Sequence, residues 1–312
     1  MDLKIFAPKE LDAVLRTLRN VAVRNDRFTE AERALIEGVA RIHGVEIDAE
    51  TLAPISFEEV ARAVTDAHPR KRALQLAMVA ALVEGTPSPE TMSAVRDLAA
   101  ALGIDEAGLD VLYRVTYGQA FFARIDMFRR IGKVMREADG FPGVLGLLRP
   151  VLRIGGGDAI TAARYGALEA CAPGTFGRAV YDHFVDNGFR FPGEPGGFPV
   201  VFHDLGHVIS GYGTDPAGEI QQAAFQAGFA RRDGFAFLLF GILQFHVGLR
   251  ITPVAKGYKG LFDVPRVLTA LARGAACRVD LSQGYDVFAN KDRSLEEVRR
   301  ELGVPPLHAA AA

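Results

Sequence analysis

Apolar residues recur every three or four positions along most of the chain, as they do on the buried face of an amphipathic helix. Between Leu11 and Val23 the apolar side chains share one helical face and the charged side chains share the other. The same spacing predicts helices over residues 60–67, 69–84 and 89–102. We therefore expect an all-α fold.

Signals for helix starts support this interpretation. Thr29 is followed three residues later by Glu32, the pattern of a capping box in which each side chain bonds the backbone N–H of the other residue. Ser56 and Glu59 repeat the pattern, and Gly44 can end the helix that Thr29 begins. Capped helices with short connections predict a small helical bundle over residues 1–117.

Residues 24–32 (RNDRFTEAE) and the helical spacing after them resemble the TerB-like domains of tellurite-resistance proteins. The resemblance implies a regulatory or protein-binding role for this half. Some relatives hold a cation with acidic side chains, so Asp26, Glu30 and Glu32 could do the same. Helix capping and a solvated face explain these three residues equally well.

Residues 118–144 form the predicted connection between two domains, with an amphipathic helix at its centre. Its apolar stripe consists of Phe121, Ile125, Phe128, Ile131 and Met135, and its basic residues are Arg124, Arg129, Arg130, Lys133 and Arg136. Such a helix could lie on an anionic membrane surface, where each basic residue contributes about 1 kcal/mol. It could also pack between the two domains, because buried helices show the same pattern.

The strongest chemical signal is a group of metal-binding residue types in the second half. On a helix, His203 and His207 lie one turn apart on a shared face, and Asp204 lies beside His207. A histidine pair of this spacing also occurs on surfaces and in hydrogen-bonded cores. The adjacent carboxylate favours a metal site.

A glycine-containing turn follows and can bring a fourth donor back. Gly211 and Gly213 can end the first helix, and Asp215 can cap a second helix that carries Glu219. The resulting helical hairpin would place Glu219 opposite the two imidazoles. Two imidazoles and two carboxylates suit zinc, iron or manganese, so we expect a divalent cation.

This motif resembles the signature of the coenzyme Q (ubiquinone) biosynthesis protein 4 family. The matching pattern is His203-Asp204-x-x-His207, then eleven residues, then Glu219. The resemblance covers roughly half the chain and extends to residues 172–179 (APGTFGRA) and, more weakly, 284–286 (GYD) and 294–299 (SLEEVR).

The resemblance implies a helical metal- and lipid-binding domain over residues 145–312. In that domain His203, Asp204, His207 and Glu219 would bind Zn2+ or another divalent metal. The family is implicated in oxidative decarboxylation at ring carbon C1 of a prenylated quinone precursor. Its members also hold an isoprenoid or other lipid, associate peripherally with membranes and organise the other quinone-biosynthesis enzymes.

Two function classes follow from these expectations. In the first, a metal-dependent enzyme uses His203, Asp204 and Glu219 in catalysis on a prenylated aromatic acid, with Asp204 or Glu219 releasing metal to substrate or carrying a proton. An oxidative reaction would need oxygen or another acceptor, because zinc has no redox chemistry. In the second, the protein is a non-enzymatic lipid-binding scaffold with a structural zinc site. A homodimer is compatible with both.

A third class, the metal-dependent phosphohydrolases of the His-Asp type, needs further ligands on separate helices. Asp182 and His183 are the only obvious candidates for these further ligands, so we consider this class less well supported than the other two.

Residues 235–249 are apolar nearly all round, which predicts a buried helix. Gln244, His246 and two glycines make it too polar for a transmembrane span. It is either plain core or the wall of an isoprenoid tunnel, in which case lipid would contact Phe237, Phe240 and Phe245.

Composition bears on domain number, binding partners and cellular location. The 312 residues, 49% of them hydrophobic, suffice for two domains, and a formal net charge of −2 gives no electrostatic reason to expect nucleic acid. Cys171 and Cys277 are too few for a disulfide framework. The first ten residues lack the apolar region of a signal peptide. We expect a cytoplasmic protein, with any membrane contact local and on the inner face.

Overall fold

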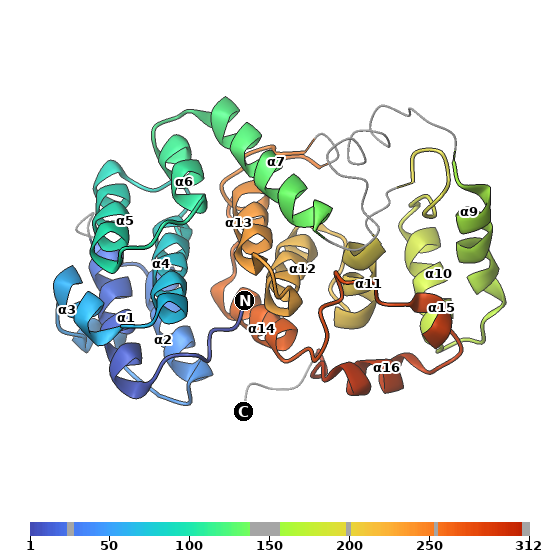
Figure 1. The fold of residues 1–312 in the computed structure, drawn as a ribbon, viewed down its shortest axis with the longest axis horizontal. Coiled ribbons are helices and arrows are strands. Elements are labelled where there is room, and N and C mark those ends of the chain that lie inside the picture. The colour runs from blue at the N-terminus through green and yellow to red at the C-terminus, as the bar shows by residue number, and fades with distance from the viewer. Residues whose placement is uncertain (24–27, 138–156, 198–200, 253–254, 308–312) are drawn as a thin grey trace.

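The computed structural model describes residues 1–23, 28–137, 157–197, 201–252 and 255–307. Within these ranges the protein is all-α, as the hydrophobic pattern predicts, with isolated β-bridges and no strand. The first half contains α1 (Pro8–Ala22), α2 (Glu30–Ile42), the short 3-10 helix η2 (Ala49–Thr51), α3 (Phe57–Ala63), α4 (Ala67–Leu82), α5 (Pro89–Leu102), α6 (Gly108–Thr116) and α7 (Ala120–Arg136) (Figure 1).

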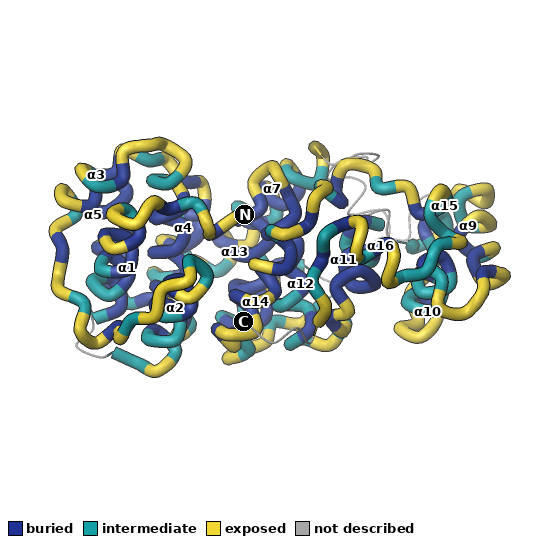
Figure 2. Tube along the Cα trace, turned by 90° about the horizontal axis from the view of Figure 1, so that it is seen from below, coloured by how far each residue is buried: buried dark blue, intermediate teal, exposed yellow. Residues whose placement is uncertain are grey.

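The second half is also helical in its described parts. Its elements are α9 (Ala159–Gly166), η3 (Ala167–Ala170), α10 (Phe176–Asp186), α11 (Val201–Ser210), α12 (Pro216–Phe229), α13 (Gly234–Phe245), α14 (Val264–Ala275), α15 (Val287–Asn290) and α16 (Leu295–Leu302). Figure 2 shows an elongated molecule with α1 to α5 at one end, α9, α10 and α15 at the other, and α12 to α14 between them.

The first half is a bundle around α4, whose residues from Arg72 to Leu82 are all buried. Both predicted capping boxes are present, at Thr29 with Glu32 and at Ser56 with the residue three positions on. Because Ser56 caps its helix directly, α3 covers residues 57–63 and not 60–67. Glu32 is thus engaged in capping, and Asp26 lies outside the described residues.

Helix α7 packs against α6 and α13, so one of its faces lies between the two halves. The buried residues are Ala123, Met127, Arg130, Ile131 and Gly132, and of these only Ile131 belongs to the predicted apolar stripe. The difference arises because Arg130 is drawn into the interior by two carboxylates. Phe121, which the stripe included, is exposed.

Those carboxylates come from both halves. The Arg130 guanidinium pairs with Glu106 at 2.7 Å and donates two hydrogen bonds to Asp233, at 2.9 and 2.7 Å. Burial alone would raise the pKa of Glu106, but the charge of Arg130 and a hydrogen bond from Gln75 hold it below its usual value. Removing one partner of such a buried pair typically costs about 3–5 kcal/mol. Glu106, Arg130 and Asp233 therefore hold the halves in one arrangement.

In the second half α12 packs against α13 on one side and α14 on another. Glycines bring α12 and α14 close together. A Cβ atom at Gly274 would lie 2.0 Å from the carbonyl oxygen of Phe225, and one at Gly228 would lie 2.4 Å from that of Leu271. Both contacts are with backbone, so a side chain here would push the helices apart.

Two further predictions concern the start of the second domain and the absence of a membrane-spanning helix. The segment from residue 145 to residue 154, where the predicted second domain begins, lies outside the described residues. Among the helices that are described, none is both long enough and apolar enough to cross a membrane.

The α12–α14 contact yields a stability prediction. Gly274→Ala should lower the free energy of unfolding by about 1–3 kcal/mol, because overpacking against backbone cannot relax. Gly166→Ala is the matched control: Gly166 has helical dihedral angles and no atom within 4 Å of its added Cβ, so it should gain about 0.5–1 kcal/mol. Denaturant unfolding followed by circular dichroism measures both, and equal stability of the two variants would contradict the packing argument.

Candidate metal site

The predicted helical hairpin is formed by α11 and α12. Helix α11 ends at Ser210, and Gly211 then takes a positive φ of 79°, which is costly for other residues. The Asp215 side chain accepts hydrogen bonds from the backbone N–H groups of Ala217 and Gly218, at 3.0 and 3.1 Å, and so begins α12. Side chains of α11 and of the first turn of α12 thereby face one another.

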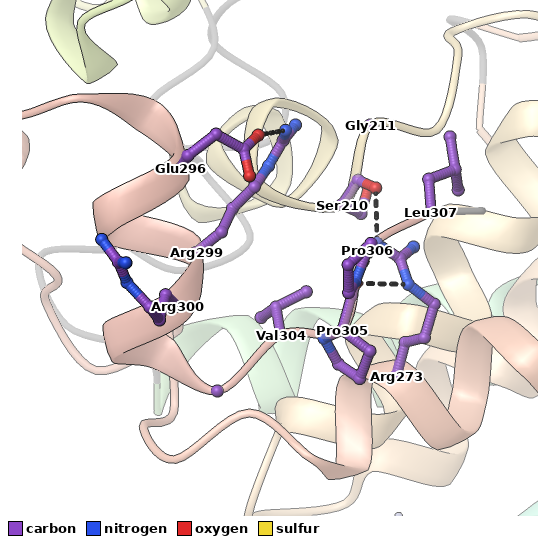
Figure 3. Close-up of a pocket in the computed structure, with 11 residues that line it drawn as sticks. Ser210, Gly211, Arg273, Glu296, Arg299, Arg300, Val304, Pro305, Pro306 and Leu307 are labelled. Carbon is purple, nitrogen blue, oxygen red and sulfur yellow. Dashed lines mark hydrogen bonds and ion pairs between the residues drawn. The ribbon is translucent and has the colours of Figure 1, made fainter. Parts of the chain in front are cut away.

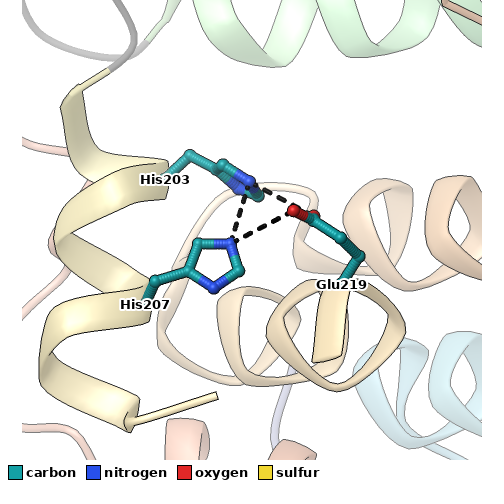
Figure 4. A group of neighbouring side chains, drawn as sticks. All are labelled: His203, His207 and Glu219. Atoms are coloured by element: carbon teal, nitrogen blue, oxygen red, sulfur yellow. Dashed lines mark hydrogen bonds and ion pairs between the residues drawn. The ribbon is translucent and has the colours of Figure 1, made fainter. Parts of the chain in front are cut away.

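Three of the predicted donors meet in this hairpin (Figure 4). His203 Nε2 lies 3.3 Å from His207 Nε2 and 3.5 Å from Glu219 Oε2, and His207 Nε2 lies 3.6 Å from Glu219 Oε1. A tetrahedral ion with bonds of about 2.0–2.1 Å holds its donor atoms about 3.3–3.4 Å apart. The spacing therefore suits a small divalent cation, and among the described residues it is the one such cluster found.

The outer nitrogens of both imidazoles are already engaged. His207 Nδ1 lies 3.0 Å from the carbonyl oxygen of Tyr212, which can only accept, so this nitrogen must donate. His203 Nδ1 lies 3.1 Å from Gln226 Oε1 and donates to it. Each neutral ring then presents an Nε2 lone pair to the same point. Such fixing of the tautomer is typical of metal-binding histidines.

Without a metal ion, a proton compensates the negative potential at this point. Burial alone would lower the pKa of His203, but the hydrogen bond and charge of Glu219 raise it to about 9. Burial and the neighbouring charge of His203 lower the pKa of His207 to about 4. One imidazole is thus charged and the other neutral near neutral pH. A metal ion must displace a single proton.

Exposure shows which side of the cluster is open. The His207 side chain is 2% exposed, whereas those of Glu219 and His203 are 21% and 34% exposed. A ligand from solution can therefore approach beside His203. Three protein ligands with an accessible remaining position characterise catalytic zinc sites, whereas structural sites are closed by four.

Close packing of the two helices depends on Gly206. A Cβ atom at Gly206 would lie 2.0 Å from Gln222 Nε2. Gln222 is fully buried and cannot swing away freely, because its Oε1 accepts a hydrogen bond from Ser210 at 2.9 Å. The absent side chain at Gly206 leaves room for this amide between the helices, at the position directly before His207.

Asp204, the fourth predicted ligand, is not part of the cluster. Its Oδ1 lies 3.3 Å from Nε2 of His183, a residue of α10. The His183 ring also stacks on His207, with centroids 5.6 Å apart and an interplanar angle of 21°. The structure therefore unites His203, His207 and Glu219, and places Asp204 and His183 as a pair beside them.

Two arginines hold the C-terminal end of α11 (Figure 3). Arg299 donates to the carbonyl oxygens of Val208 and Ile209, both at 2.9 Å, and Arg273 donates to that of Ser210 at 3.0 Å. The last carbonyls of a helix lack partners within it, and cations suit this end of the helix dipole. The same arginines line a groove of 760 Å³, which is separate from the three clustered donors.

The phenylalanines expected to contact lipid lie on α13. Phe237 and Phe245 are buried and Phe240 is half-buried. The Phe237 ring lies 6.3 Å from that of Phe202 on α11, so this apolar wall extends to the metal helix. Neither the groove beside Arg273 nor the 310 Å³ cavity beside Leu15 involves these rings. Their role in lipid binding stays a prediction.

Sequence reasoning missed the residues that orient the ligands. Gln222 and Gln226 follow Glu219 by three and seven positions, so the three polar residues share one face of α12, and that spacing was a usable signal. Arg299 falls in segment 294–299, which carried part of the family resemblance. Nothing in the sequence distinguished Arg273.

Comparison with known proteins adds no assignment. No protein-family model matches the chain, and no match was found among curated proteins.

Competition between metal and proton predicts how affinity depends on pH. Since His203 is protonated below about pH 9, apparent metal affinity should rise about tenfold per pH unit from about pH 6 to about pH 8 and level off above about pH 9. Titration against a chromophoric chelator at several pH values measures this slope. A slope of log affinity against pH near zero, or near two, would contradict the displacement of a single proton from His203.

The three-donor cluster predicts different effects for the two carboxylates. Glu219→Gln should weaken metal binding at least about a hundredfold, because it removes a ligand, whereas Asp204→Asn should weaken it less than about tenfold. Elemental analysis and chelator competition on the purified variants provide the comparison. If Asp204→Asn loses metal as completely as Glu219→Gln, the site has four protein ligands.

Proposed function

We propose that this protein binds a divalent metal ion through His203, His207 and Glu219 and acts on a prenylated aromatic acid in the biosynthesis of ubiquinone or a related quinone. The observation that carries the proposal is the convergence of two oriented imidazoles and a carboxylate at one partly open point. The motif resemblance supplies the substrate class.

Each residue has a role that follows from its surroundings. A divalent cation bound here would polarise a carboxylate or ring oxygen of the substrate and stabilise the charge that develops as carbon dioxide leaves. His207, held by a backbone carbonyl and buried, fixes the position of the site. His203 and Glu219 line its accessible side. In the proposed reaction Asp204, which pairs with His183, would exchange a proton next to the ligands.

An oxidative decarboxylation also requires an electron acceptor. Zinc does not supply redox chemistry. Two histidines and one carboxylate with open positions also form the ligand set of non-haem iron(II) sites that use oxygen. Elemental analysis of the purified protein therefore decides whether oxygen can react at this site or whether the oxidant acts in a separate step.

The alternative is a lipid-binding scaffold with a structural zinc site. Structural zinc sites in proteins are closed by four protein ligands. Here three donors converge and the His203 side chain remains 34% exposed, which favours the catalytic role.

Complementation tests this function. In cells that lack the gene and depend on it for quinone synthesis, His207→Ala and Glu219→Gln should lower quinone content at least about tenfold and cause a prenylated, still carboxylated precursor to accumulate. His68→Ala, which changes an exposed histidine of α4, is the matched control and should restore synthesis. Normal quinone content with a metal-free variant would exclude the catalytic role and leave the scaffold.

A further inference from the structure

The first half carries a group of exposed aromatic side chains at the turn between α6 and α7. Of the eleven large apolar side chains exposed in the described ranges, four lie within ten positions of the chain here. They are Tyr113, Tyr117, Phe121 and Phe122, which are 37%, 47%, 64% and 53% exposed. We call these four residues the aromatic corner. Figure 1 shows this turn at the upper edge of the molecule, where it projects from the bundle.

The rings of the aromatic corner are ordered by contacts with one another and with arginines. The Tyr113 and Tyr117 rings lie 4.6 Å apart, and those of Phe121 and Phe122 lie 5.5 Å apart. The Arg114 guanidinium lies over the Phe122 ring at 5.4 Å. The exposed rings thus form two packed pairs, and each pair has an arginine over one of its rings.

The free face of α7 adds positive charge next to the aromatic corner. At about 100° per residue, five exposed residues of α7 fall within an arc of about 120°: Phe121, Phe122, Arg129, Lys133 and Arg136. Gly132 lies in the same arc and is buried. The helix contains one acidic residue, Asp126, and it is paired with Arg114. No unpaired acidic residue of α7 therefore offsets the positive charge of this face.

We propose that the aromatic corner and the free face of α7 dock on the surface of an anionic phospholipid membrane. Phenylalanine and tyrosine rings suit the boundary between headgroups and acyl chains. The basic residues that follow attract anionic headgroups, although the chain as a whole has a net charge of −2. The inference does not depend on the metal site, which lies on α11 and α12, so either can fail without the other.

Vesicle binding by the full chain tests the proposal. The protein should sediment with phosphatidylcholine vesicles that contain phosphatidylglycerol, and binding should weaken with added salt. The combined substitutions Phe121→Ser and Phe122→Ser should lower the partition coefficient at least about tenfold. Arg129→Gln with Lys133→Gln should lower it about tenfold or more, since each basic residue contributes about 1 kcal/mol.

The control is Ile160→Ser, which removes the most exposed apolar side chain of the described ranges, 77% exposed on α9, and should leave binding unchanged. Circular dichroism confirms that each variant is folded. Equal binding to pure phosphatidylcholine, unchanged binding of the phenylalanine variant, or no binding of the unaltered protein would each overturn the proposal. A change in oligomeric state without vesicle binding would also overturn it, and would assign the aromatic corner to a protein partner.

Discussion

Two imidazole lone pairs and a carboxylate directed at one point repel each other unless a cation lies between them, and the second half of this protein is built around that constraint. His207 cannot relieve the repulsion by exchanging its tautomer, because the carbonyl of Tyr212 accepts only from a protonated Nδ1. Glu219 cannot retreat far, since it belongs to the first turn of α12. A proton on His203 or a metal ion are the two ways of satisfying the site.

The surrounding structure keeps these groups close, and it requires particular residues at several positions to do so. Gly206 admits a buried glutamine amide between α11 and α12, and Gly274 admits the backbone of α12 against α14. Arg273 and Arg299 hold the other end of α11 through its carbonyls. Because the helix is fixed at its C-terminal end and along one face, the two histidines have little freedom to separate. A rigid pair of this kind binds a metal with little reorganisation.

Much of this arrangement could be predicted from the sequence. Helical periodicity and capping residues gave the all-α fold, and the capping boxes at Thr29 and Ser56 are present as predicted. The hairpin that returns Glu219 to His203 and His207 followed from glycine and Asp215 between two helical stretches. These features are local, and local chemistry determines them.

Features that depend on distant partners could not be predicted in the same way. Spacing on α11 alone made Asp204 equivalent to the histidines, but His183, twenty-one positions earlier, pairs with it. The buried face of α7 depends on Arg130, whose partners are Glu106, in the loop between α5 and α6, and Asp233, the residue before α13. Which side chain a residue meets across the core is decided by packing, and a single sequence carries little of that information.

The central claim concerns what occupies the point between the imidazoles, and the X-ray absorption spectrum of the protein as purified measures it most directly. The account predicts one bound divalent metal ion with two imidazole nitrogens and at least one carboxylate oxygen at about 2.0–2.2 Å. A first shell without imidazole, a sulfur ligand from Cys171 or Cys277, or protein that takes up no metal would contradict it.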